Sequence, residues 1–327
     1  MSKSSAKFIS VFIPTYNGEK YIGESIEAVL NQDLPPGYNL ELIIIDSGSR
    51  DATVQIIENH YADRVRFIKI PNEEFGHGKT RQYAAEIAKG DYILFLSQDA
   101  TPTNYRWLIN MIEPFFISSK VGCVFGRQIP RPHSVPTIKR EVSSVFTGLG
   151  PINSIVIQRS KSLVDNEPVG AINTFFSDVN SAIRKDLVTK IPFRDVRYAE
   201  DQALAQDMQS NGFLKAYTSD GSVWHSNEYT AKEYYHRKFD EYSGLQNSVS
   251  EKLSPSIRSL FLGWVRPTLE DWKFTRYDRE YNGYVKLKFL ILSPAYNFYM
   301  QLGKYRAIRH FNNPMMQKKY SLEERRK

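Results

Sequence analysis

The sequence predicts an α/β protein with a mostly parallel sheet flanked by helices, followed by a helical C-terminal region. Three observations support this fold class. Strand-like and helix-like segments alternate through the first hundred residues, polar residues follow several of the strand-like runs, and the last hundred residues are basic, aromatic and helical in pattern. Alternating strands and helices with short connections are typical of a parallel sheet covered by crossover helices.

The predicted strands are short apolar runs, and the predicted helices between them place apolar side chains on one face. Ile22, Ile26 and Val29 form such a face. The predicted strands are residues 8–13, 42–45, 65–70, 92–96, 121–125 and 179–183, with a strand pair at 215–217 and 222–225. The predicted helices are residues 19–32, 51–61, 79–89, 103–116, 200–211, 231–251, 256–272 and 284–310. Residues 127–198 otherwise lack a clear period, which favours binding loops.

Composition limits the classes of protein that the chain can belong to. A chain of 327 residues with 41% hydrophobic content can bury a large core. Its one cysteine, Cys123, lies in an apolar run, so we expect a core thiol and no intramolecular disulfide. The apolar stretch near the N-terminus is too brief for a secretory signal. These features favour a cytoplasmic protein.

Charge is distributed unevenly along the chain. The net charge is +7, but from Lys252 to Lys327 the sequence holds 16 Lys and Arg against 6 Asp and Glu, a surplus of +10. The remainder then holds 27 against 30 and is nearly neutral. Charge steers a partner when it is gathered on one surface, so the C-terminal region is the candidate for an anionic partner.

Polar residues follow the first, second and fourth predicted strands. In open parallel sheets the ligand site lies beyond the carboxyl ends of the strands, so these residues are expected to share one crevice. The carboxylate of Asp99, which follows an apolar strand, is therefore expected to face that crevice. The three segments are Pro14 to Gly18, Asp46 to Asp51 and Ser97 to Ala100.

The chain resembles the family-2 glycosyltransferases with the GT-A fold. The resemblance covers residues 8–226, and it depends on a series of motifs rather than on any one of them. These motifs are SVFIPTYN at 10–17, DSGSRD at 46–51, Thr80-Arg81-Gln82, Ser97-Gln98-Asp99-Ala100, Asn180-Ser181-Ala182, Glu200-Asp201 and Trp224-His225. Within the family, residues 75–102 look most like the bacterial rhamnosyltransferases that use dTDP-L-rhamnose.

The resemblance implies a catalytic domain over residues 1–226. Its nucleotide-binding half covers about residues 1–100, and its acceptor half covers about 101–226. Residues 227–327 then form the basic, aromatic helical C-terminal region.

The nucleotide of the donor is expected at the strand-end segments. A carboxylate such as Asp46 can accept the N3–H of a pyrimidine with the strength of a charge-assisted bond, and Arg81 can donate to a carbonyl of the same ring. The small residues of 47–49 let the backbone approach the ribose. An alternative is that Asp46 only caps the next helix. The predicted donor-binding residues are Pro14, Thr15, Tyr16, Asn17, Asp46, Ser47, Ser49, Arg81 and Gln98.

A divalent metal is implied by the resemblance, with Asp99 and His225 as its protein ligands. The family usually carries Asp-x-Asp here, and Ser97 replaces the first acid. One carboxylate can suffice, because Mg²⁺ keeps waters and takes further ligands from substrate phosphate. The imidazole favours Mn²⁺, and Mg²⁺ remains open. Alternatively, His225 is only a hydrogen-bonded histidine at a strand end.

The resemblance assigns Asp201 as the general base. Transfer with inversion needs a carboxylate to take the proton of the acceptor hydroxyl. Glu200 is expected to orient the acceptor, and Asp178 and Asn180 are expected to line the sugar pocket. The alternatives are that the acids at 200 and 201 only favour a helix N-terminus and that residues 178–180 form a simple turn.

The 15 uncharged residues from Phe289 to Gly303 are flanked by lysines and arginines. A transmembrane helix needs about 20 apolar residues, so this run is too short to span a bilayer. It suits a helix at an anionic membrane interface, and equally a helix packed on the rest of the protein.

These features together predict an inverting, metal-dependent transferase of L-rhamnose from dTDP-L-rhamnose to a saccharide acceptor. A lipid-linked acceptor at the inner face of the cell membrane is favoured, within cell-surface polysaccharide synthesis. One alternative is a UDP-hexose donor, since uracil and thymine share the N3–H group. Two others are a nucleic-acid-binding protein using the basic tail and a catalytically silent binding module. With the transferase hypothesis, no nucleic-acid partner is expected.

Overall fold

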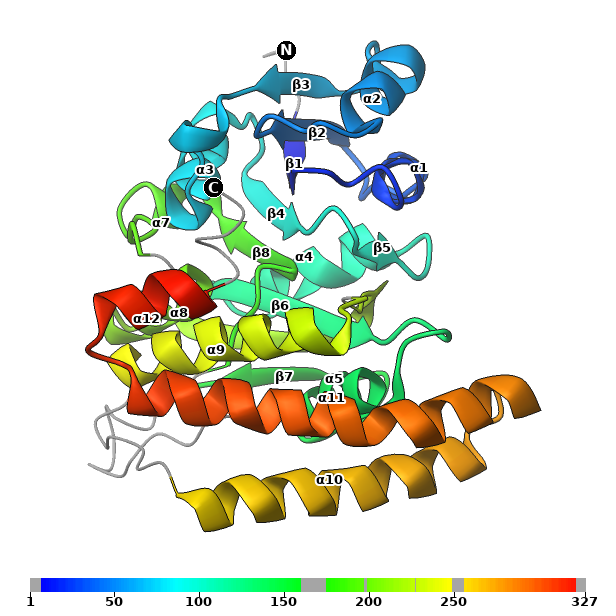
Figure 1. The fold of residues 1–327 in the computed structure, drawn as a ribbon. Coiled ribbons are helices and arrows are strands. Elements are labelled where there is room, and N and C mark those ends of the chain that lie inside the picture. The colour runs from blue at the N-terminus through cyan, green and yellow to red at the C-terminus, as the bar shows by residue number, and fades with distance from the viewer. Residues whose placement is uncertain (1–6, 160–174, 197–198, 227, 249–255, 322–327) are drawn as a thin grey trace, which may run out of the picture. The chain divides into compact units, whose positions relative to one another are not determined.

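The computed structural model describes residues 7–159, 175–196, 199–226, 228–248 and 256–321 (Figure 1). The chain forms two compact units. The sheet unit comprises Met1–Ile129 and Val145–His225, and the helical unit comprises Pro130–Ser144 and Ser226–Lys327. Residues 130–144 therefore belong to the helical unit, although Val145–His225 of the sheet unit separates them in sequence from the other residues of the helical unit.

The sheet unit is built on one nine-stranded sheet in the order β3-β2-β1-β4-β8-β6-β9-β5, with β7 paired to β9. Strands β3, β2, β1 and β4 are mutually parallel, and β8 runs antiparallel between β4 and β6. Strand β9 is parallel to β6. The strands are β1 Lys7–Thr15, β2 Tyr38–Asp46, β3 Arg66–Lys69, β4 Tyr92–Leu96, β5 Thr101–Pro102, β6 Val121–Ile129, β7 Ile155–Gln158, β8 Asn180–Arg184 and β9 Leu214–Trp224.

Helices follow the strands in the order that the apolar periodicity predicts. The side chains of Ile22, Ile26 and Val29 on α1 are fully buried in the same core as Ile9 and Val11 of β1, which explains why this helix packs on the sheet. The helices of the sheet unit are α1 Ile22–Leu30, α2 Thr53–Tyr61, α3 His77–Ile87, α4 Trp107–Ile117, α7 Lys185–Val188 and α8 Glu200–Ser210, with a 3-10 turn η1 at Asn72–Glu74.

The mixed α/β fold class is confirmed, and two local predictions are corrected. The expected strand pair at 215–217 and 222–225 is one strand, β9. The segment 127–198 is more regular than its sequence indicates, because it contains α5 (Pro136–Thr147), β7 and α7. Polar side chains such as Thr137 and Lys139 are buried on α5, and this obscures the apolar period that would have predicted a helix. Residues 160–174 of that segment and 249–251 of a predicted helix lie outside the described residues.

Over its described residues, the helical unit holds four further helices and most of α5. Helix α11 packs beside α9 and beside α10 (Figure 1). Among the described residues, no helix has both the length and the hydrophobicity needed to cross a bilayer. The four helices are α9 Ala231–Ser248, α10 Ile257–Tyr277, α11 Gly283–Arg309 and α12 Pro314–Tyr320.

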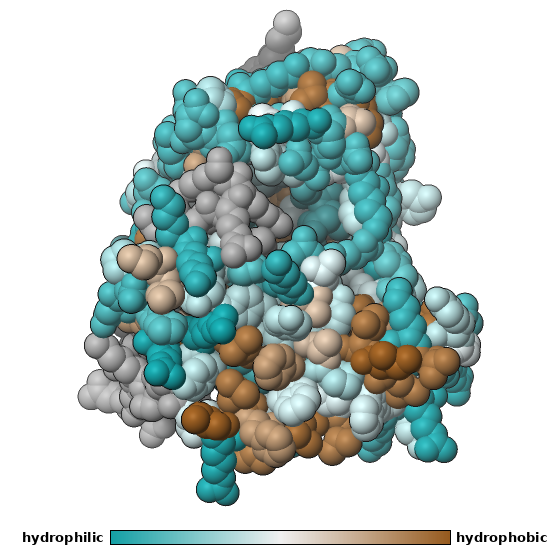
Figure 2. All heavy atoms as spheres, viewed as in Figure 1, coloured by the Kyte–Doolittle hydropathy of each residue, from teal (hydrophilic) through white to brown (hydrophobic). Residues whose placement is uncertain are grey.

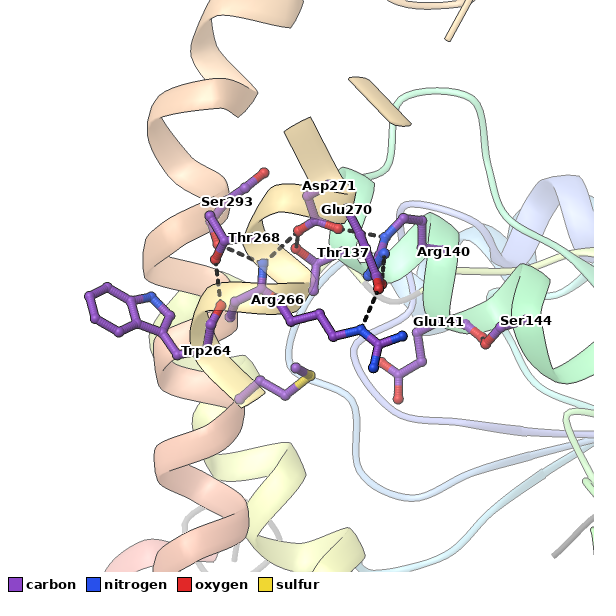
Figure 3. A network of polar contacts seen from close by, with 12 residues as sticks. Thr137, Arg140, Glu141, Ser144, Trp264, Arg266, Thr268, Glu270, Asp271 and Ser293 are labelled. Atoms are coloured by element: carbon purple, nitrogen blue, oxygen red, sulfur yellow. Dashed lines mark hydrogen bonds and ion pairs between the residues drawn. The ribbon is translucent and has the colours of Figure 1, made fainter. Parts of the chain in front are cut away.

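A buried carboxylate connects three helices of this unit. Asp271 of α10 is fully buried, and its oxygens accept hydrogen bonds from Thr137 Oγ1 at 2.5 Å and from Asn297 Nδ2 at 2.6 Å. Arg140 Nε of α5 lies 2.7 Å from the same carboxylate (Figure 3). A buried charge persists only where it is paired and hydrogen-bonded, so this network fixes which face of α10 is turned inward.

Candidate active site

Sheet topology brings the predicted site residues to one edge of the sheet. Strands β1, β2 and β4 are parallel, so the residues after each of them lie at a common edge. Strand β8 is antiparallel to β4, with Asn180 paired to Leu96, so Asp178 just before β8 lies at that edge as well. Strand β9 runs in the direction of β4, which places His225 there too. The expected crevice residues are therefore neighbours in the fold.

Gln98 connects the loops after β4 and β1. Its Oε1 accepts hydrogen bonds from Thr15 Oγ1 at 2.7 Å and from the backbone N–H of Tyr16 at 2.8 Å, and its Nε2 donates to the carbonyl of Tyr16 at 3.1 Å. A Cβ at Gly18 would lie 2.4 Å from Gln98 Oε1, so a larger residue there would displace the Gln98 side chain from these hydrogen bonds. Gln98 and Thr15 thus shape the predicted nucleotide loop through contacts within the protein.

The loop after β2 is organised by Asp46. This carboxylate is almost fully buried, and it accepts hydrogen bonds from the backbone N–H groups of Gly48 and Ser49 at 3.0 Å each and from the hydroxyl of Ser49. Asn17, in the loop after β1, receives a hydrogen bond from Arg50 and donates its own N–H to Ser49 Oγ. The first two strand-end loops are therefore joined into one surface.

The remaining predicted donor residues lie at the same place. Pro14 is paired with Ile45 at the end of β1, and Ser47 donates its N–H to the carbonyl of Thr15 at 3.0 Å. Tyr16 continues the loop after β1. The geometry groups all of these residues, and their contact with a nucleotide stays a prediction.

Asp99 and His225 face each other, with Asp99 Oδ2 at 3.6 Å from His225 Nε2. The short strand β5 explains this approach. Thr101 pairs antiparallel with Trp224, so the chain just before Thr101 lies opposite the residues that follow Trp224. The side chain of His225 is 8% exposed and that of Asp99 is 26% exposed, so the imidazole is buried and the carboxylate is partly open to solvent.

Gln128 on β6 is a site residue that the sequence reasoning did not single out. Its Oε1 lies 3.0 Å from His225 Nδ1, and its Nε2 donates to Ser177 Oγ at 3.1 Å. An Nδ1–H donated to Gln128 leaves a lone pair on Nε2, directed at Asp99. A lone Gln in a strand gives no signal in the sequence, so only the pairing of β6 with β9 reveals this contact.

A second group of ionisable side chains surrounds Arg81 of α3. Arg81 Nη1 lies 2.8 Å from Glu200 Oε1, and Arg81 Nε lies 3.1 Å from Asp178 Oδ2. Ser181 Oγ donates to Asp178 Oδ1 at 2.6 Å. Arg81, Asp178 and Glu200 are all buried, so the guanidinium is held by two carboxylates at this site. Its predicted contact with a pyrimidine ring stays a prediction.

Asp201 completes this group. Its Oδ2 accepts a hydrogen bond from the backbone N–H of Asp178 at 3.2 Å, and its Oδ1 accepts one from Gln202 at 2.7 Å. Burial, followed by the negative charges of Glu200 and Asp178, raises the pKa of Asp201 to about 8, against the opposing effect of Arg81. Burial raises the pKa of Asp178 to about 6, again opposed by Arg81.

Asn180 is placed in the core. It is fully buried, its Oδ1 accepts a hydrogen bond from Trp107 Nε1 at 2.9 Å, and its Nδ2 donates to the carbonyl of Gly221 at 2.7 Å. Both ends of the amide are thus occupied by the protein. Asn180 therefore connects β8 to α4 and β9, and its contact with a sugar stays a prediction.

The donor set limits the kind of metal site that is available. Within the described part of the chain, no group of three or more His, Cys, Asp or Glu side chains is arranged to hold a metal ion. The pair Asp99 and His225 offers one carboxylate and one imidazole. Such a pair fits a cation that completes its coordination from phosphate and water.

The fold and this edge of the sheet define a glycosyltransferase of the GT-A class. The model of the family described as "Glycosyl transferase family 2" matches residues 10–191, which is more than half of the chain. The chain belongs to this family. The predicted enzyme class is thereby confirmed, and family membership favours an enzyme over the nucleic-acid-binding and silent alternatives.

Curated relatives point in the same direction. The chain is 30% identical over 259 residues to the O-antigen chain rhamnosyltransferase RfbN of Salmonella typhimurium, covering 78% of this chain and 76% of the relative. It is 30% identical over 236 residues to the O-antigen chain rhamnosyltransferase WbaN of Salmonella anatum, covering 71% and 70%. The predicted similarity to bacterial rhamnosyltransferases is confirmed.

Solved structures share the fold. The mannosyltransferase PcManGT from Pyrobaculum calidifontis, in complex with GDP-Man and Mn²⁺, has a TM-score of 0.56 at 16% identity and covers 93% of this chain and 86% of that one. S. aureus TarS 1–349 has a TM-score of 0.50 at 20% identity and covers 92% and 91%. At these identities the likeness establishes the fold alone.

Proposed function

We propose that the protein transfers L-rhamnose from dTDP-L-rhamnose, with inversion, to a lipid-linked saccharide acceptor in cell-surface polysaccharide synthesis. The observation that carries this proposal is the gathering of Asp99, His225 and Asp201 at the edge of the sheet where the strand-end loops meet. The choice of rhamnose is supported by the similarity to the two Salmonella O-antigen rhamnosyltransferases.

The donor nucleotide would bind against the loops after β1 and β2. Asp46 already accepts hydrogen bonds from its own loop, and a carboxylate has lone pairs left for the N3–H of a thymine. The positive φ of 83° at Gly48 turns the backbone so that the ribose can lie close to it.

Asp99 and His225 are the residues that would hold a divalent cation, Mn²⁺ or Mg²⁺. Their polar atoms face each other, and the hydrogen bond to Gln128 leaves His225 Nε2 able to bind a metal. A cation there would supply charge stabilisation for the diphosphate leaving group. The absence of a first acid at Ser97 leaves the site with one protein carboxylate, so most of the remaining ligands would come from phosphate.

Asp201 would take the proton from the acceptor hydroxyl. Arg81 pairs with Asp178 and Glu200, whereas Asp201 accepts its hydrogen bonds from backbone N–H groups. The raised pKa of Asp201, at about 8, makes it a stronger base than an ordinary aspartate. Glu200, held by Arg81, would orient the acceptor.

A different donor is the second candidate. The chain is 35% identical over 167 residues to the S. aureus poly(ribitol-phosphate) beta-N-acetylglucosaminyltransferase TarS, which covers 48% of this chain. This likeness favours a UDP-hexose as the alternative, because Asp46 would accept the N3–H of uracil equally well.

The proposed place of action is the cytoplasmic side of the cell membrane, where a lipid-linked acceptor would be presented. The experiment is to incubate the purified chain with dTDP-L-rhamnose or UDP-hexoses, an acceptor extract and Mn²⁺ or Mg²⁺, and to measure nucleoside diphosphate release. We expect release from dTDP-L-rhamnose that requires metal and acceptor. Turnover of a UDP-hexose alone would select the second candidate, and no turnover of any donor would overturn the proposal.

A further inference from the structure

The buried side chains of helix α10 are polar, whereas many of its large apolar side chains are exposed. Its buried residues are Thr268, Asp271 and Thr275. Soluble helices normally bury the apolar face, so this inverted pattern needs an explanation. The exposed large apolar side chains of this helix are Ile257, Phe261, Leu262, Leu269, Trp272 and Tyr277.

Helix α11 lies antiparallel beside α10 and extends the same surface. Trp272 Nε1 donates to the carbonyl of Leu290 at 2.9 Å, and Trp264 Nε1 donates to that of Pro294 at 2.9 Å. Figure 2 shows hydrophobic side chains gathered in the region where Figure 1 places these two helices. The exposed apolar side chains that α11 adds are Tyr284, Leu287, Leu290, Ile291, Phe298 and Tyr299. We call these residues, with those of α10, the hairpin face.

The inverted orientation is fixed by the interior of the helical unit. The contacts of Asp271 with Thr137 and Arg140 (Figure 3) hold the polar side of α10 inward. The hydrogen bond from Asn297 of α11 adds to them. Turning the helix to bury its apolar side would leave this carboxylate without those partners. The cost of breaking a buried ion pair explains why the apolar side stays outside.

Charges around the hairpin face are strongly positive. Residues 257–309 contain ten Lys and Arg and four Asp and Glu. All four acids lie in ion pairs, because Glu270 and Asp271 contact Arg140 while Asp278 and Glu280 contact Lys139. Two cations of helix α5 therefore neutralise the acids, and Arg266 of α10 also pairs with Glu270, so the other cations of α10 and α11 give this region its positive charge.

A groove beside the turn that connects α10 to α11 joins cations to apolar side chains. Its volume is about 580 Å³, and its lining includes Lys273, Arg276 and Lys286 beside Trp272 and Tyr277. Aromatic rings with cations beside them are typical of segments that lie at the level of lipid headgroups.

We propose that the hairpin face docks on an anionic phospholipid surface, with its apolar side chains in the outer acyl region and the groove cations on headgroup phosphates. A bilayer fits the combination of an apolar strip and a surplus of cations better than a second copy of the chain does, because two positive faces would repel each other. This inference rests on the proposed function, because docking on a membrane would bring the enzyme to its lipid-linked acceptor. The sequence predicted an interfacial segment at 289–303 only. The hairpin face is larger, because half of its exposed apolar residues come from α10.

Vesicle flotation of the full chain tests the proposal. We expect the protein to float with phosphatidylcholine vesicles that contain phosphatidylglycerol, and to float poorly with pure phosphatidylcholine or at high salt. Lys273→Gln with Arg276→Gln should weaken binding about 25-fold, at about fivefold for each cation. Leu269→Gln with Ile291→Gln should weaken it about tenfold for each side chain.

Matched variants on other surfaces serve as controls. Ile117→Gln with Ile152→Gln replaces side chains with the same exposures, 55% and 68%, as Leu269 and Ile291. Lys120→Gln with Lys190→Gln removes two exposed cations outside the hairpin face. Both controls should bind vesicles as the parent protein does, and circular dichroism should show all variants folded.

Three outcomes would overturn the inference. These are no binding of the parent protein to anionic vesicles, equal losses in the control variants, and a dimer in solution that the Leu269→Gln and Ile291→Gln variant converts to a monomer without any vesicle binding. Vesicle binding needs no catalysis, so the Asp201→Asn variant should still float. A protein that floats but turns over no donor would contradict the proposed function and leave the docking surface intact.

Discussion

Two groups of ionisable side chains, one in each unit, respond to their surroundings in opposite ways. In the helical unit, burial acts to raise the pKa of Glu141, but the ammonium of Lys238 more than offsets it, so the pKa is lowered. In the sheet unit, burial and two neighbouring carboxylates raise the pKa of Asp201 to about 8, and Arg81 only partly opposes them. Glu141 thus shares Lys238 with one other acid, Glu241, whereas Asp201 shares Arg81 with two.

This difference indicates that the group around Lys238 is structural, whereas the group around Arg81 has the features of an acid–base site. Lys238 Nζ lies close to Glu141 and 2.7 Å from Glu241, so its charge and its hydrogen bonds are used within the protein. Around Arg81, three carboxylates compete for one guanidinium. Crowded like charges with too few cations are a common feature of acid–base sites.

The largest expected effect is on activity. Asp201→Asn should lower kcat by about 10²- to 10⁴-fold, because the acceptor hydroxyl loses its general base. Glu241→Gln, which removes one of the two acids that contact Lys238 in the helical unit, should leave kcat unchanged. Nucleoside diphosphate release under saturating donor and acceptor measures both. Equal kcat for Asp201→Asn and the parent protein would remove Asp201 from the mechanism.

The next effect is on stability. Arg81→Gln should lower the free energy of unfolding by about 3–5 kcal/mol at pH 7, since it leaves buried acids without their cation. The loss should shrink at pH 5, because Asp178, with a pKa of about 6, becomes protonated in the folded state between pH 7 and pH 5, whereas Asp201, with a pKa of about 8, is mostly protonated at both. Urea unfolding at the two pH values measures this. A loss that does not change with pH would contradict the electrostatic account.

The comparison variant in the helical unit is Glu141→Gln, which should cost only about 1 kcal/mol, because this side chain is 38% exposed and Glu241 still pairs with Lys238. If Glu141→Gln lowered the free energy of unfolding as much as Arg81→Gln does, the groups around Lys238 and Arg81 would not differ in the way described.

Metal affinity tests the role of Gln128. Gln128→Leu should weaken Mn²⁺ binding about 10- to 100-fold, because His225 would lose the partner that fixes its tautomer. Electron paramagnetic resonance of Mn²⁺ gives the affinity, and nitrogen NMR of the metal-free protein should place the proton of His225 on Nδ1. Gln128→Glu should preserve that tautomer. A proton on Nε2, or an unchanged Mn²⁺ affinity in Gln128→Leu, would contradict the assignment.

The smallest effect is the dependence of rate on pH. The base must be ionised, so kcat/KM should rise by about tenfold for each pH unit below the pKa of Asp201 and level off near pH 8. Stability should change in the opposite direction. The folded state binds the extra proton, so the contribution of Asp201 to stability falls as pH rises from its ordinary value of 3.8 to about 8. In Asp201→Asn this fall should be smaller, and thermal unfolding at a series of pH values measures it.

Sequence patterns predicted the parts of the molecule that depend on neighbouring residues. The apolar runs gave the positions of β1, β2 and β4, and the polar residues after them indicated the edge that holds the candidate site. The approach of Asp99 to His225 followed from the order of the motifs in the family that the chain resembles. Of the missed elements, α5 has buried polar residues, and β7 and α7 have too few residues to show a period.

Sequence alone therefore determined the fold class, the family and the set of strand-end residues, because these depend on local periodicity and on motifs. Tertiary structure alone decided that Gln128 supports His225, that Arg81 is held by Asp178 and Glu200, and that α10 turns its apolar side outward. Each of these depends on pairs of residues from distant elements. Such pairs are chosen by the balance of burial, charge and hydrogen bonding in the folded chain, which no local pattern records.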